Sequence, residues 1–163
     1  MPERKTIERA RLDAREGKSA GTQAGEFVRE EIHHIREGKH GAGSPQQAIA
    51  IGLSKARRAG VRLAPPAKGK TSAKVREQAM RDNRKGRKRA SAKPSPRRSR
   101  ATFGALKKEG TTAASHKSLS RQAAASAKRR GASARHQATM RGVRTKSAAV
   151  RSAAATKAAR ARG

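Results

Sequence analysis

The chain has 163 residues, of which 42 are Lys or Arg and only 11 are Asp or Glu, so its formal net charge is +31 at pH 7. Large apolar residues are too few to fill a core along the whole length, a composition typical of partly disordered chains. The sequence has no cysteine, which excludes disulfides and thiolate metal sites, and no apolar stretch of transmembrane length.

The charge divides the chain near Pro65 and Pro66. Residues 1–64 hold 13 basic and 8 acidic residues, whereas residues 65–163 hold 29 basic and 3 acidic ones. The larger apolar residues are concentrated in the first part. We therefore expect a mostly α fold: a small N-terminal domain of about three short helices (1–64), then a basic, low-complexity tail (65–163). The tail is predicted to be largely disordered, with transient helices, and to bind nucleic acid.

Two helices are predicted before residue 38. Residues 3–16 form the first, with Gly17 as its stop, and its apolar side carries Ile7, Ala10 and Ala14. The second is predicted to begin at a Thr22 cap and to end near Glu37, before Gly38. Its residues at helical spacing form one apolar stripe: Ala24, Phe27, Val28, Ile32 and Ile35.

The third predicted helix begins with Ser44 as N-cap, Pro45 in the first turn and Gln47 closing a capping box, and it stops at Gly60. Its apolar face consists of Ala48, Ile49, Gly52, Leu53 and Ala56. A glycine inside a helix costs about 1 kcal/mol relative to alanine, so Gly52 indicates close approach of another helix. We expect the stripe of the second helix to pack there, with Lys55, Arg57 and Arg58 pointing away.

The polar residues of the second helix and the following turn do not form a pattern typical of a catalytic or metal-binding site. Glu30 and Glu31 lie outside the apolar stripe, which favours surface ion pairs over acid–base catalysis. His33 and His34 are adjacent and leave a helix on different sides, so with His40 they are predicted to be exposed or capping rather than metal ligands. No catalytic motif is present, and we expect no enzyme activity, no cofactor and no metal.

After residue 65, a fourth helix is predicted at about 72–83 and a short one at 102–108, separated by a basic linker at 84–100. The linker contains the "SPRR" pattern at Ser95, which resembles the short turns of eukaryotic histone tails that follow the DNA minor groove. A plain basic linker is the alternative. From residue 111 onward the chain is rich in Ala, Lys, Arg and Ser, and "RQAAASAKRRG" (121–131) resembles "RSAAATKAARARG" (151–163).

The segment "TQAGEFVREEIHHIREGKHGAGSPQQAIAIGLSKARRAG" (22–60), with its run from Gln47 to Gly60, carries a family resemblance. It is similar to a group of small, very basic bacterial proteins that share a Q-A-I-A-I-x-L-S-x-A-R-x-A-G run, are labelled DNA-binding, and have no assigned mechanism. The tail resembles bacterial histone-H1-like proteins in its Ala, Lys, Arg and Ser content. These resemblances imply DNA binding, a cytoplasmic and nucleoid-associated location, and a bacterial source.

The charge itself predicts sequence-independent binding of DNA through its phosphates, in the manner of a histone-like protein. Tyr and Trp are absent, so the base-stacking platforms of single-strand and many RNA modules cannot be built. RNA or ribosome binding is one alternative, and a helical protein-interaction module localised by its tail is another. Self-association through the N-terminal helices stays open, and membrane binding is not expected.

The residues predicted to contact nucleic acid are basic and lie in four groups. A helix-turn-helix reading, in which the third helix enters the major groove, is a further alternative for the last group. The four groups are Arg84, Lys85, Arg87, Lys88 and Arg89; Arg97, Arg98 and Arg100; Lys128, Arg129 and Arg130; and Lys55, Arg57 and Arg58.

Overall fold

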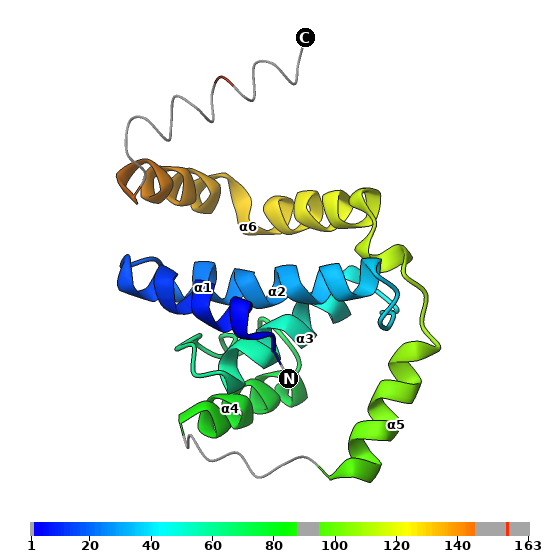
Figure 1. The fold of residues 1–163 in the computed structure, drawn as a ribbon. Helices are drawn as coiled ribbons and strands as arrows, with labels where there is room; N and C mark the ends of the chain where they lie inside the picture. Colours follow the sequence, from blue (N-terminus) through cyan, green and yellow to red (C-terminus); the bar gives the residue numbers. More distant parts are fainter. Residues whose placement is uncertain (1, 88–94, 146–155, 157–163) are drawn as a thin grey trace. The chain divides into compact units, whose positions relative to one another are not determined.

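The computed structural model describes residues 2–87, 95–145 and 156, and all regular elements among them are helical (Figure 1). In chain order they are α1 (Arg4–Arg15), α2 (Ala20–Arg36), α3 (Pro45–Arg58), α4 (Ala73–Arg87), α5 (Pro96–Lys107), the short 3₁₀ helix η1 (Thr112–Ala114) and α6 (His116–Thr145). The prediction of a mostly α fold is confirmed. Two compact units, Met1–Ser120 and Arg121–Gly163, are described separately.

The first three helices begin and end largely where the sequence predicts. Ser44 Oγ accepts a hydrogen bond from the backbone N–H of Gln47 at 3.2 Å, which caps α3. The cap of α2 is not Thr22 but Ser19, whose Oγ accepts from the Thr22 N–H at 3.2 Å, so α2 begins at Ala20. After α3, Gly60 has a φ of +97°, a conformation that glycine adopts without strain.

Helices α2 and α3 pack antiparallel and form the centre of the first unit. Ala24 and Phe27 pack with Ala56 in one buried cluster, and Ile35 packs with Ala48 in a second. Between the two clusters, a Cβ on Gly52 would lie 2.6 Å from Val28 Cα. The predicted packing of the α2 stripe on the α3 face is therefore confirmed, and its reason is the missing side chain at Gly52.

Helix α1 covers the first cluster. Ala10 is buried there and Ile7 packs at its edge, as predicted, but the buried face turns toward Thr6 and Asp13 rather than Ala14. The backbone N–H of Glu3 donates to Glu30 Oε2 at 3.1 Å, and this bond attaches the start of α1 to α2.

Helix α4 packs against α3, so that α3 lies between α2 and α4 (Figure 1). Ser54 Oγ donates to Asp82 Oδ2 at 2.6 Å, and the α4 glycine Gly86 comes into contact with the backbone carbonyl of Arg57. Residue 54 therefore faces 82 and residue 57 faces 86, which means that α3 and α4 run in the same direction. Both carboxyl ends come together.

Residues near 110 complete the second cluster. Ala113 and Ala114 of η1 are buried against Ile35 and Ala48. The turn between α2 and α3 is held by two backbone bonds, from Gly41 N to Leu106 O at 2.9 Å and from Ala42 N to Gly110 O at 3.1 Å. We call residues 37–43 the strap.

In the described residues beyond 64, helices replace much of the tail that we expected to be largely disordered. Alanine explains the difference: Ala79, Ala113 and Ala114 supply buried surface without adding large apolar residues to the composition. In the second unit, α6 continues to Thr145 with a break at Gly131, whose φ is 76° and ψ 169°. The segment 151–163, predicted to resemble 121–131, falls outside the described residues apart from Thr156.

Candidate nucleic-acid interface

A groove of about 1260 Å³ lies where α3, the chain after it and the end of α4 meet. Seven arginines line it, and Glu77 is the only acidic residue among the described residues of its wall. These side chains, which we call the arginine groove, are Arg11, Arg57, Arg58, Arg62, Arg81, Arg84 and Arg87. A guanidinium group can donate two parallel hydrogen bonds to one phosphate, so this wall suits a polyanion such as nucleic acid.

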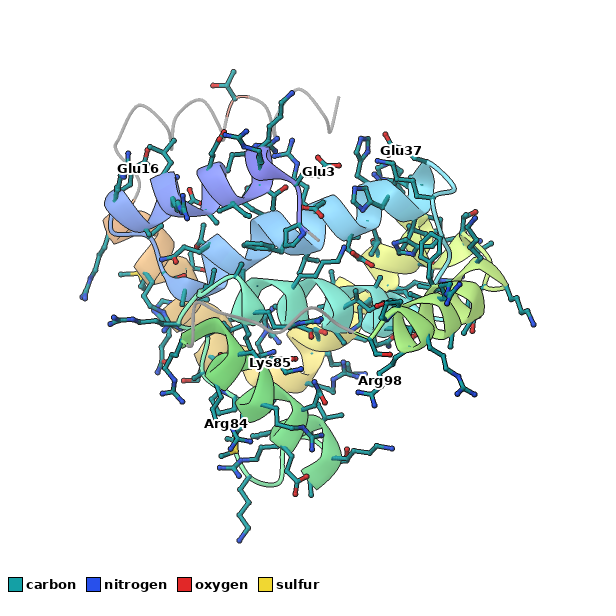
Figure 2. All side chains as sticks on the ribbon, turned by 60° about the horizontal axis from the view of Figure 1, so that its bottom comes forward. Glu3, Glu16, Glu37, Arg84, Lys85 and Arg98 are labelled. Carbon is teal, nitrogen blue, oxygen red and sulfur yellow. The ribbon has the colours of Figure 1, made fainter. Side chains whose placement is uncertain are left out.

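The groove exists because two helices end at the same place. Both helices carry basic residues in their last turns, where the helix dipole places a partial negative charge. These residues are Lys55, Arg57 and Arg58 in α3 and Arg84, Lys85 and Arg87 in α4. Glu3, Glu16 and Glu37 lie along the side formed by α1 and α2 in Figure 2. Arg84 and Lys85 extend from α4, on the other side of α3.

Arg57 is the buried base of the groove, with 8% of its surface exposed. Its Nη2 donates to Ala64 O at 3.3 Å, which ties down the chain that follows α3. Burial lowers the pKa of the Arg57 guanidinium, and the charge of Asp82 opposes that shift. The Nε of Arg57 is itself buried and has no hydrogen-bond acceptor within the described part of the chain.

Lys55, Arg57 and Arg58, which the sequence predicts to point away from the centre of the apolar face, have different surroundings. Lys55 is paired with the buried carboxylates of Glu31 and Glu30, and Arg57 is covered because α4 packs beside it. Arg58 is exposed, but its Nε lies 3.5 Å from Asp82 Oδ1 and its Nη2 donates to Ser54 Oγ at 2.9 Å. Helix α3 packs against both α2 and α4, and of its residues only Gln46, Ala50 and Arg58 are exposed, which disfavours the entry of this helix into a major groove that the helix-turn-helix reading requires.

The remaining predicted contacts are distributed over several elements. Arg84 and Arg87 line the arginine groove, and Lys85 is exposed beside them on α4. Lys88 and Arg89 lie outside the described residues. Arg97, Arg98 and Arg100 are exposed in the first turns of α5, where Pro96 occupies the start of a helix. The "SPRR" pattern therefore opens a helix and does not form the isolated turn of the histone-tail comparison.

In the second unit, Lys128, Arg129 and Arg130 are exposed on α6 directly before the break at Gly131. Arg129 Nη2 donates to Ser126 Oγ at 3.3 Å, and Arg135 Nη1 donates across the break to Ala127 O at 3.1 Å. No described side chain of α6 is buried in the second unit.

The prediction of surface ion pairs at Glu30 and Glu31 is wrong. Only 6% of Glu30 and 1% of Glu31 is exposed, because α1, α3 and the strap cover this side of α2. Glu31 also belongs to the one group of described residues with the spacing of metal ligands, together with His34 and His40. The sequence missed this cluster because His40 reaches it from the strap.

Three members of the groove wall, Arg11, Arg62 and Arg81, were not among the predicted contacts. Arg11 comes from the first predicted helix and Arg62 and Arg81 flank the predicted boundary, so no local run of basic residues marked them.

Comparison with known proteins adds no assignment: no protein-family model, no curated protein and no solved structure matches the chain. No helix in the described ranges is both long and apolar enough to cross a membrane.

Proposed function

We propose that this protein binds nucleic acid without sequence preference, through contacts to phosphates, and that duplex DNA is its main partner. The observation that carries the proposal is the arginine groove, in which seven guanidinium groups converge with one carboxylate in the described wall. Such a surface attracts phosphate oxygens at any base sequence, because the backbone charge is uniform.

Further basic groups extend the footprint beyond the groove. Exposed arginines on α5 and exposed Lys and Arg residues on α6 add phosphate contacts along a strand. The chain has two phenylalanines and no Tyr or Trp. Phe27 is buried and Phe103 is partly exposed, so few side chains could stack on bases. The binding energy in this proposal therefore comes from charge, as in a histone-like protein that coats or bridges duplexes.

We also propose that α6 is only marginally folded without nucleic acid. Ala favours helix in this region, and repulsion among Lys and Arg opposes it. Neutralisation by phosphates would remove the repulsion and leave the helix preference.

The test is a series of binding measurements between about 50 and 200 mM salt, the range over which phosphate contacts lose most affinity. Ten phosphate contacts on duplex give a log–log slope of about −9, and each lost contact reduces it by about 0.9. The variant with Arg62, Arg84 and Arg87 changed to Ala should show a slope lower by about 3 and weaker binding.

The matched control changes Arg4, Lys5 and Arg15 to Ala, an equal charge loss on α1 outside the groove wall. Equal losses in both triple variants would contradict the groove as the site. A wild-type slope near zero would contradict electrostatic binding altogether. Tighter binding of structured RNA than of duplex at matched salt would make RNA the partner in place of DNA.

A further inference from the structure

Glu31, His34 and His40 form a second cluster of chemical interest, on the opposite side of α3 from α4. Glu31 and His34 are one turn apart on α2, which places them on the same side of the helix, and His40 comes from the strap. One side-chain nitrogen or oxygen from each residue lies within 4.8 Å of the others. His40 Nε2 and Glu31 Oε1 are the nearest pair, at 3.2 Å.

The protein alone does not satisfy this pair. The carbonyl of Gly41 can only accept, so His40 Nδ1, 3.0 Å away, carries the proton and donates to it. In a neutral imidazole, Nε2 then holds a lone pair that faces the Glu31 carboxylate. Neither oxygen of Glu31 receives a hydrogen bond of good geometry from the described residues, although its side chain is only 1% exposed. Two lone pairs that face each other in a buried place call for either a proton or a metal ion between them.

The distance is compatible with two ligands of one ion as well as with a hydrogen bond. Two ligand atoms that are each about 2.0–2.1 Å from a tetrahedral ion lie roughly 3.3–3.4 Å apart. The 3.2 Å between His40 Nε2 and Glu31 Oε1 is close to this spacing. Two imidazoles and one carboxylate are a donor set that suits Zn²⁺, whereas Mg²⁺ and Ca²⁺ prefer oxygen ligands.

The surrounding groups would hold these ligands in place. Lys55 pairs with Oε2 of Glu31, which orients the carboxylate and leaves Oε1 toward His40. Glu3 Oε1 lies 2.8 Å from His34 Nε2 and fixes that ring. Hydrogen bonds of this kind from outside the ligand set are the usual support of histidine and carboxylate ligands.

We propose that Glu31, His34 and His40 bind one Zn²⁺ ion that joins α2 to the strap. The strap in turn holds the end of α5 through the Gly41–Leu106 backbone bond, and the His40 ring packs edge-on against Phe103 at 6.4 Å between centroids. An ion at this cluster would therefore stabilise the attachment of α5 and η1 to α2 and α3. This inference does not depend on the proposed nucleic-acid binding.

The test uses the full chain, freed of nucleic acid because phosphates bind divalent ions. Co²⁺ is titrated as a visible probe, since its absorption bands in the 550–700 nm region are strong only in tetrahedral sites of roughly this ligand type. We expect bands that saturate at about one Co²⁺ per chain and disappear when Zn²⁺ is added. Mg²⁺ in excess should not displace the probe.

Two variants remove a ligand, and one leaves the cluster intact. His34→Gln and His40→Gln should each lower the affinity for Zn²⁺ by a factor of at least about 10 to 100 and abolish the cobalt bands. The control is His33→Gln, a neighbouring histidine that is 69% exposed and pairs with Glu37, and it should bind as the wild type does. If His40→Gln loses helix by circular dichroism, the comparison of His34→Gln with His33→Gln decides. Absence of cobalt bands in the wild type, or equal affinity in all three variants, would overturn the proposal.

Discussion

Gly52 of α3 lies directly against Val28 of α2, and a Cβ at Gly52 would come within 2.6 Å of Val28 Cα and 2.9 Å of Val28 N. Both atoms belong to the backbone, so the clash cannot be relieved by turning a side chain. Gly52→Ala should therefore push the two helices apart and reduce the free energy of unfolding by about 1–3 kcal/mol, despite the better helix propensity of alanine.

The control for that experiment is Gly25→Ala on α2, where a Cβ would meet no atom within 4 Å. This change should raise the free energy of unfolding by about 0.5–1 kcal/mol. Urea unfolding followed by circular dichroism measures both. A Gly52→Ala variant as stable as Gly25→Ala would contradict the close contact of α2 and α3.

Asp82 is the polar anchor between α3 and α4. It is 2% exposed, accepts hydrogen bonds from Ser54 Oγ at 2.6 Å and Gln78 Nε2 at 3.1 Å, and lies 3.5 Å from Arg58 Nε. Asp82→Ala leaves the Ser54 hydroxyl without this acceptor and should destabilise the first unit by about 1–3 kcal/mol. Glu77→Ala, an exposed change on the same helix, should alter stability by less than about 0.5 kcal/mol.

The ion pairs of Lys18 should make the stability of the fold depend on pH in the alkaline range. Hydrogen bonds to Asp13 and Glu16 raise the pKa of Lys18 well above its ordinary 10.5. Because the folded pKa is the higher one, the stabilisation is fully present below pH 10.5 and is lost as pH rises toward the folded value.

The test compares urea unfolding of the wild type and Lys18→Met at pH 7, 9 and 11. The difference in stability should be small, because Lys18 is exposed, equal at the two lower values, and smaller at the highest. A difference that grows with pH would contradict the pairing of Lys18 with Asp13 and Glu16.

The second cluster predicts how truncated chains behave. A chain ending at residue 64 lacks Ala113 and Ala114, which cover Ile35 and Ala48, and it also lacks α4. It should be less stable than a chain ending at residue 120, and its unfolding should depend less steeply on urea because less surface is exposed. Equal stability of the two chains would show that residues 1–64 fold without the later elements.

Nucleic acid should add helix to the C-terminal region. We expect the far-ultraviolet helix signal of the full chain to rise on titration with duplex DNA, because phosphates neutralise the like charges around Lys128, Arg129 and Arg130. A chain ending at residue 120 should show a smaller rise. No added helix in the full chain would count against the marginal stability of α6.

Local signals were enough to predict the first three helices and their packing. Ser44, Pro45 and Gly60 mark the ends of α3 by their own backbone preferences, and the apolar spacing in α2 marks its packed face. Gly52 was informative for the same reason, since a glycine on an apolar helix face has few explanations other than close contact.

Contacts between distant segments could not be predicted in this way. Glu31 is buried because Lys55 from α3 and His40 from the strap reach it, and neither partner is visible from the α2 sequence. Alanines such as Ala79 and Ala114 bury well but resemble a low-complexity tail in composition. The sequence predicted only part of the arginine groove, because the groove joins residues from three separate stretches of chain.

The position of η1 has a consequence for the order in which a ribosome delivers the chain. The cluster around Phe27 is complete once residue 63 has emerged. The cluster of Ile35 and Ala48 stays incomplete until Ala113 and Ala114 emerge, some fifty residues later. During that interval the nascent chain exposes one apolar end while its most basic stretch is still being made. A chaperone that binds apolar segments of nascent chains would find its target there, and slowing translation after residue 64 should prolong the exposure.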